Sequence, residues 1–356
     1  MGNRRTELGS EYHLDLSELS RVEKNVYHLL DPFPHVIYYD SGRSAIREFA
    51  KLMKEGQRVL LPEYICESVI RCFPSERIDF YRVLPDLTID MEDVKSKLKA
   101  SNGVFFLMQY FGRLFPEERL QEIGRLAKER GWLILEDTTH SFFSATMTIG
   151  DYMVCSLRKW MPISQGGVLY SKDAAIGMPD FMPEKSADNE RITGFILKDQ
   201  FLKGNGDYNA EYRRIFAACE ERLDRQKSSY LMSDLNCFVA ECIDVKELVA
   251  VRKRNAGLLE TLLPQELVLI QFREDDCPFG IPVRVPERNR FREYLMENRI
   301  YCAVHWPFDG FLEDQRPGAA ANAKELITLP IDQRYAEEDI RYMADMIKKY
   351  GGKLKF

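Results

Sequence analysis

Residues 103–140 read GVFFLMQYFGRLFPEERLQEIGRLAKERGWLILEDTTH, and this stretch predicts a strand, a helix and a second strand. The apolar runs GVFFLM and WLIL have the length of buried strands. Between them, Leu120, Ile123 and Ala127 recur at helical spacing, and Gly131 is a typical helix stop. A strand, a helix and a strand in this order predict a βαβ unit, which is the building block of a parallel sheet.

The same alternation extends from about residue 36 to 170, with further apolar runs at 58–65, 77–84 and 166–171. It predicts an α/β fold with a mostly parallel central sheet flanked by helices. A length of 356 residues favours about two domains. We therefore expect a large α/β domain over residues 1–240 and a smaller α+β domain over 241–356.

The smaller domain is expected to contain strands at 267–272 and 280–285 and helices at 288–299 and 336–352. It is preceded by a long helical pattern over 237–263, which ends before Pro264.

Residues 172–230 interrupt the alternation. The part from 178 to 194 is polar and rich in proline, and the part from 203 to 229 predicts a loop followed by a charged helix. We interpret 172–230 as an atypical insertion or a lid-like connection.

Composition excludes several classes of protein. The longest apolar runs fall far short of the roughly 20 residues of a membrane span, and residues 1–19 have no apolar signal core, so a cytoplasmic protein without membrane contact is expected. Eight cysteines without CxxC pairs argue against a zinc ribbon or a disulfide framework. A net charge of −6 argues against nucleic acid as a partner. No metal is expected.

Three separate segments carry residues suited to one cofactor. Asp137 follows the apolar strand WLIL, where a side chain faces the ligand crevice of an open α/β sheet. Ser156 and Lys159 lie three residues apart in SLRK. Ser41 and Gly42 form a turn that opens a helix, whose free N–H groups suit a phosphate. A carboxylate, an amine and a phosphate cradle are what pyridoxal 5′-phosphate (PLP) requires.

Each of these residues also has a structural interpretation. Lys159 read alone is a surface lysine, since most lysines are. Asp137 suits a turn or a helix N-cap, and Ser156 suits a local cap of the backbone. Their occurrence together favours the cofactor site.

At this point the chain resembles the DegT/DnrJ/EryC1/StrS family of fold-type-I aminotransferases. The matching segments occur in the family's order over about residues 36–350, with 172–230 unmatched. They are DSGRSAI (40–46), RVLLPEYICESV (58–69), LPDLTIDMEDVKSKL (84–98), MQYFGRLF (108–115), LEDTTHSF (135–142), SYLMSDLNCFVAECIDVKEL (229–248), IYCAVHWP (300–307) and LPIDQRYAEEDI (329–340).

The resemblance implies roles for individual residues. Lys159 would form the internal aldimine and move the proton, and Asp137 would pair with the pyridinium nitrogen. The residues expected to bind the cofactor are Gly42, Arg43, Ser44, Tyr64, Cys66, Asp137, His140, Ser156 and Lys159. In this set Gly42, Arg43, Ser44 and Ser156 would hold the phosphate, Tyr64 or Cys66 would lie over the ring, and His140 would contact the ring oxygen. His305 and Arg158 are weaker candidates for substrate contacts.

The resemblance further implies an aminotransferase that moves an amino group from glutamate or glutamine to a keto-sugar, expected to be nucleotide-linked, by ping-pong chemistry. It also implies a homodimer with a shared active site. Three departures from the family pattern are Gln165 in place of Glu, Ser229 in place of Asn and Leu231 in place of Arg. Two alternatives therefore stay open: a PLP enzyme with a non-sugar keto substrate, and a catalytically degenerate regulatory or binding protein of the same fold.

Overall fold

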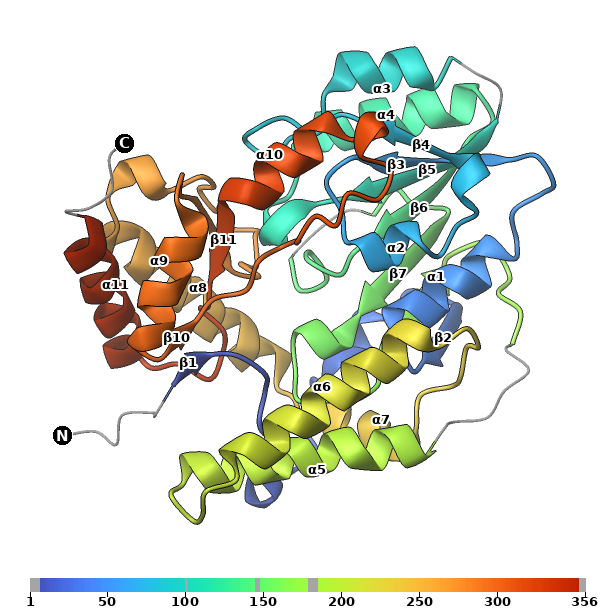
Figure 1. The fold of residues 1–356 in the computed structure, drawn as a ribbon. Coiled ribbons are helices and arrows are strands. Elements are labelled where there is room, and N and C mark those ends of the chain that lie inside the picture. The colour runs from blue at the N-terminus through green and yellow to red at the C-terminus, as the bar shows by residue number, and fades with distance from the viewer. Residues whose placement is uncertain (1–6, 100–101, 145–147, 179–184, 352–356) are drawn as a thin grey trace.

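The centre of the molecule is a seven-stranded sheet with the strand order β2-β8-β7-β6-β5-β3-β4 (Figure 1). The computed structural model describes residues 7–99, 102–144, 148–178 and 185–351. The strands are β2 (His35–Tyr39), β3 (Arg58–Pro62), β4 (Ile78–Tyr81), β5 (Gly103–Met108), β6 (Leu133–Asp137), β7 (Tyr152–Ser156) and β8 (Gly167–Ser171). In this sheet β8 is antiparallel to both neighbours, and the other pairs are parallel. The predicted mostly parallel sheet is confirmed.

Helices connect these strands and cover the sheet. They are α1 (Gly42–Ala50), α2 (Glu67–Ile70), α3 (Met91–Lys97) and α4 (Glu117–Glu129). In α4 the residues Leu120, Ile123 and Ala127 are buried, as their spacing predicted. The described residues also include short 3-10 helices: η1 (Leu16–Glu18), η2 (Val26–Leu29), η3 (Ser75–Arg77), η4 (Tyr110–Gly112), η5 (Leu157–Lys159), η6 (Gln265–Leu267) and η7 (Glu313–Gln315).

The atypical segment contains a helical hairpin, in which α5 (Lys185–Leu202) and α6 (Asn209–Arg225) lie side by side (Figure 1). The expectation of a polar connection before residue 194 is wrong where the structure describes it, because α5 begins at Lys185. The buried face of α5 includes Arg191, Lys198 and Asp199. Each of these charges has an ion-pair partner, which allows its burial.

The long helix predicted over 237–263 is two helices, α7 (Asp234–Glu241) and α8 (Val245–Leu262). The break lies at Asp244, whose side chain accepts a hydrogen bond from the Glu247 N–H at 3.0 Å and caps α8.

The C-terminal part combines helices and strands. It contains β9 (Ile281–Arg284), α9 (Arg288–Glu297), β10 (Ile300–Tyr301), α10 (Pro317–Glu325), β11 (Leu326–Leu329) and α11 (Glu337–Gly351). β9 and β11 are antiparallel, and helices α8, α9 and α11 gather around them (Figure 1). The strand predicted at 267–272 is absent from the structure, where Val268 makes one isolated bridge to Val283. Among the described residues, no helix is long and apolar enough to cross a membrane.

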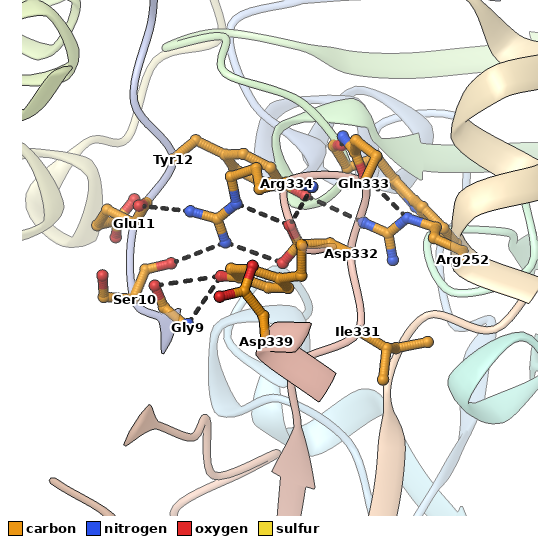
Figure 2. Close-up of polar contacts among 12 residues, drawn as sticks. Gly9, Ser10, Glu11, Tyr12, Arg252, Ile331, Asp332, Gln333, Arg334 and Asp339 are labelled. Carbon is orange, nitrogen blue, oxygen red and sulfur yellow. Dashed lines mark hydrogen bonds and ion pairs between the residues drawn. The ribbon is translucent and has the colours of Figure 1, made fainter. Parts of the chain in front are cut away.

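Residues 7–14 form an N-terminal strap across the C-terminal part. β1 (Leu8–Gly9) pairs in parallel with β10, and the Gly9 N–H donates to the Tyr335 hydroxyl at 2.7 Å. Arg334 donates to the backbone carbonyls of Ser10 and Glu11 and forms an ion pair with Asp332 at 2.7 Å (Figure 2). The strap is thus fixed by both backbone and side-chain contacts.

Candidate active site

Three of the predicted cofactor residues lie where β6, β7 and α1 end or begin. Asp137 ends β6, Ser156 ends β7 and Gly42 begins α1. A Cβ atom on Gly42 would lie 3.0 Å from the Ser156 Cβ, which is tighter than most real contacts. The sequence segments around residues 42 and 156 are therefore in direct contact, and a side chain at position 42 would require the neighbouring Ser156 to shift by a few tenths of an ångström.

The N-terminus of α1 offers backbone donors. The Ser41 hydroxyl accepts the Ser44 N–H at 3.2 Å, and Arg47 donates to the Ser44 hydroxyl at 2.9 Å, so both serine side chains are engaged within the helix. In the part of the chain that the structure describes, the N–H groups of Gly42 and Arg43 have no hydrogen-bond partner. These two N–H groups and the hydroxyl of nearby Ser156 are the donors that an anion would meet.

Asp137 is a buried carboxylate, 5% exposed. The Thr139 N–H donates to its Oδ1 at 2.9 Å, and across the described ranges Asp137 has no ion pair. Burial raises the pKa of Asp137 because water no longer solvates the charged form. A cationic group bound beside it would offset this cost.

Thr139 connects the residues on either side of the site, and it was not among the predicted residues. Its hydroxyl accepts the Ser156 N–H at 3.0 Å, and its carbonyl accepts the indole N–H of Trp160 at 2.6 Å. Because its own N–H donates to Asp137, Thr139 contacts the predicted carboxylate, the backbone of Ser156 and the residue after Lys159. Its position in EDTTH gave no sequence signal for this role.

Lys159 ends η5, and its exposed side chain borders a cavity of about 630 Å³. The cavity lies among the strap, the α5–α6 hairpin and the C-terminal part, with Ser10, Arg213 and Thr328 among its lining residues. Within the described residues, the Lys159 amino group has no hydrogen bond or ion pair. It is the free amine that a carbonyl ligand in this cavity would encounter.

His140 lies in an aromatic cluster beside the cavity. Its ring stacks on Phe279 at 4.1 Å and on Trp306 at 5.5 Å between centroids, and His305 meets it edge-on at 5.7 Å. Burial and the charge of Lys159 lower the pKa of both histidines, that of His305 to about 3. Both rings are therefore neutral near pH 7. The Nδ1 atom of His140 accepts the Phe111 N–H at 3.3 Å, which places the His140 proton on Nε2.

The two predicted ring neighbours lie in different surroundings. Tyr64 is 1% exposed and packs against Tyr110 and Trp306, at centroid distances of 6.1 Å and 5.4 Å. Cys66 stands at the start of α2, with its Sγ 3.0 Å from the Ser68 hydroxyl. Tyr64 thus belongs to the aromatic cluster that includes Trp306, whereas the thiol of Cys66 contacts the hydroxyl of Ser68 in α2.

A group of charges next to Lys159 includes two residues that the sequence did not indicate, Arg191 and Glu220. The Glu220 carboxylate accepts hydrogen bonds from Arg158 at 2.7 Å and Arg191 at 2.5 Å, and it lies 3.9 Å from Arg43. Burial acts to raise the pKa of Glu220, but the charges of Arg158, Arg191 and Lys159 outweigh it and hold that pKa at about 2. Arg158, a predicted substrate contact, is therefore paired within the chain.

The C-terminal part supports the segment that carries Lys159. The guanidinium of Arg252 lies 4.4 Å from the centre of the Trp160 ring. It also donates to the Gln333 side chain at 3.0 Å (Figure 2). Gln333 in turn donates to the Trp160 carbonyl at 2.6 Å. Arg252 is 1% exposed, so this contact is shielded from water.

Comparison with known proteins agrees with this architecture. The family model for aminotransferase class I and II matches residues 21–158. A pleiotropic regulatory protein of Geobacillus stearothermophilus is 18% identical over 280 residues, covering 74% of this chain and 69% of that protein.

Solved structures match almost the whole chain. A putative sugar aminotransferase from Streptococcus pneumoniae, in a PMP form, superposes with a TM-score of 0.68 at 14% identity, covering 98% of each chain. A DegT DnrJ EryC1 StrS aminotransferase from Brucella abortus gives 0.64 at 14% identity, covering 96% of this chain and 92% of that one. The predicted resemblance is confirmed, and the chain has the fold of these aminotransferases.

Proposed function

We propose that this chain, with its aminotransferase fold, is a PLP-dependent aminotransferase that moves an amino group from glutamate or glutamine to a keto-sugar, expected to be nucleotide-linked. One observation carries the proposal. Within the described residues, Thr139 joins the segment of Asp137, a buried carboxylate without an ion pair, to Ser156, which contacts Gly42, and to Trp160, which directly follows Lys159.

The residues present fit the cofactor. Asp137 would hold the pyridine nitrogen in its protonated form, and this would compensate the buried carboxylate. The N–H groups of Gly42 and Arg43 and the Ser156 hydroxyl would bind the phosphate, and Lys159 would bond to the aldehyde. When bound, PLP supplies an electron sink for the carbon that loses or gains a proton. A relative from Streptococcus pneumoniae has been solved in a PLP form as well as a PMP form.

The chain's own residues would then orient the reactants and move one proton. Lys159 Nζ faces the cavity, so it would take the proton from the donor's carbon and later return it to the acceptor's carbon. Neutral His140, with its proton on Nε2, would act as a donor to a ring oxygen rather than as an acceptor. The aromatic residues around it, including Phe279 and Trp306, would exclude water from that side.

The keto-sugar acceptor is supported by cavity size and by the similar proteins. A cavity of about 630 Å³ is in the range of sites for ligands larger than an amino acid. The proposal includes a homodimer and a cytoplasmic location, which rest on the family resemblance and on the cysteine usage. Measurement of the mass in solution would test the dimer.

A regulatory role without turnover is the second candidate. A curated relative is a pleiotropic regulatory protein, and Ser229 and Leu231 stand where the family pattern has Asn and Arg. A single experiment separates the two candidates: the absorption spectrum of the purified protein with PLP, before and after glutamate or glutamine is added. A lysine-bound cofactor spectrum that the donor converts supports the aminotransferase. A bound spectrum that neither donor changes argues against the proposed donors, and no binding argues for the regulatory protein.

A further inference from the structure

A carboxylate from the α5–α6 hairpin fills a cationic group of residues beside Lys159. Glu220 of α6 contacts Arg158 of η5 and Arg191 of α5, with Arg43 of α1 3.9 Å away. One carboxylate from the atypical segment is thus held by arginines from three separate elements.

Glu220 does not accept a hydrogen bond from every N–H donor of Arg158 and Arg191. The Nε atoms of Arg158 and Arg191 are both buried, and neither has a hydrogen-bond partner among the described residues. Arg191 as a whole is 6% exposed. Arg191 has a second carboxylate contact, to Glu11 of the strap at 2.8 Å. Buried guanidinium groups with unused donors favour a further anionic partner.

This charged group lies at the part of the cavity that Lys159 lines. Arg158, Lys159, Arg191 and Glu220 all line the cavity of about 630 Å³. Arg158 directly precedes Lys159 in the sequence, so a ligand carboxylate held by Arg158 would stand near the Lys159 amine.

We propose that Arg158 and Arg191 form a carboxylate-binding subsite, which Glu220 occupies in the unliganded protein and which the carboxylate of the amino donor takes over during the reaction. The existence of the subsite does not depend on the proposed function, but its assignment to the amino donor rests on it.

The bound group itself indicates the ligand class. The subsite already holds a carboxylate, with one oxygen shared between two guanidinium groups, and planar guanidinium groups suit the planar carboxylate. A glutamate side chain is thus an internal model of the ligand. To admit such a ligand, the α5–α6 hairpin would withdraw the Glu220 side chain from the subsite by about the length of that side chain. The central sheet would not have to change.

Chemical rescue tests the subsite on the whole protein without added cofactor. The variant Glu220→Ala removes the internal carboxylate, and alanine keeps the helix propensity of α6. Acetate is then titrated and followed by thermal unfolding and calorimetry. We expect acetate to bind Glu220→Ala about tenfold more tightly than it binds the wild type, the effect of one charge-assisted contact. The matched control is Glu221→Ala, which removes a neighbouring exposed carboxylate paired with Arg225 and should behave as the wild type.

Three outcomes would overturn the subsite or its ligand class. Equal acetate binding by both variants and wild type would show a nonspecific effect. Phosphate that rescues Glu220→Ala as well as acetate would contradict the carboxylate assignment. Rescue that survives Arg191→Gln in the Glu220→Ala background would remove Arg191 from the subsite. If Glu220→Ala does not fold, the isosteric Glu220→Gln undergoes the same titration.

The donor assignment has its own measurement. In the cofactor-loaded protein, Glu220→Gln should lower the KM for glutamate while kcat changes little, because the competing carboxylate is gone. An unchanged or raised KM would contradict the assignment. If the wild type binds no PLP, the proposed function fails, and the acetate titration still decides on the subsite.

Discussion

The indole N–H of Trp160 donates a hydrogen bond of 2.6 Å to the backbone carbonyl of Thr139. This bond joins the residue after Lys159 to the residue two after Asp137. The candidate amine comes from η5 and the candidate carboxylate from β6, yet one threonine fixes the relative position of their segments.

Thr139→Val should weaken PLP binding while the protein stays folded. Valine keeps the shape of the side chain but leaves the Ser156 N–H without its acceptor, at a cost of about 1–3 kcal/mol. Titration of PLP followed by absorption measures the effect. Thr139→Ser retains the hydroxyl and should bind as the wild type, whereas equal loss in both variants would contradict a positioning role of the hydroxyl.

Lys159→Arg should abolish the covalent attachment of PLP. Arginine keeps the positive charge near Glu220 but has no amine that forms a Schiff base under these conditions. Borohydride reduction followed by peptide mass analysis should find the cofactor on Lys159 of the wild type and nowhere on the variant. Cofactor on another lysine of the wild type would refute the assignment.

Gly42→Ala should weaken the binding of PLP and of inorganic phosphate. The new Cβ would press on the Ser156 Cβ at 3.0 Å and disturb the turn that offers the two free N–H groups. Gly257→Ala in α8 is the matched control, since a Cβ there meets nothing within 4 Å. Calorimetry with phosphate measures both variants, and equal affinities would argue against a phosphate site at α1.

Arg252→Leu should destabilise the protein by about 3 kcal/mol, because it removes a shielded cation–π contact and several buried hydrogen bonds. Urea unfolding measures the loss. Arg254→Gln, at an exposed position of the same helix, should cost far less. A similar cost in both variants would show that Arg252 contributes through helix propensity alone.

Stability should fall as the pH drops from about 6.5 towards about 3. The folded-state pKa of His305 is about 3, below that of an unfolded histidine, so the unfolded chain takes up the proton first. The contribution of His305 is therefore complete above pH 6.5 and is lost on acidification. His305→Asn should flatten this part of the stability profile relative to the wild type, and replacement of the exposed His28 by Asn should not. An unchanged slope in His305→Asn would contradict the neutral state of His305 in the folded protein.

Periodicity and motif order predicted the central sheet and the meeting of the segments around Gly42, Asp137 and Ser156. These features could be read because buried strands and α4 have apolar faces, and because parallel strands present their carboxyl ends on one edge. Lys159 borders the cavity of about 630 Å³. The roles of these residues stay proposals.

The α5–α6 hairpin could not be read in the same way. Its buried face includes Arg191 and Lys198, and a pattern that equates burial with apolar residues misses such a helix. Glu220 was missed because its partners Arg158 and Arg191 lie 62 and 29 residues away, and no local pattern encodes such pairs. The expected strand at 267–272 does not form. An apolar run becomes a strand when a partner strand pairs with it, and here Val268 makes a single isolated bridge to Val283.

The strap bears on the order in which the chain can fold during its synthesis. Leu8 is made early but pairs with Ile300, and Gly9 bonds to Tyr335, 326 residues later. While the ribosome adds the intervening residues, the strap has no place to dock. The sheet can form first. The wall that the strap contributes to the cavity of about 630 Å³ is completed after Arg334 has emerged. A ribosome stalled between residues 300 and 335 should therefore hold a chain with a formed sheet and an open cavity.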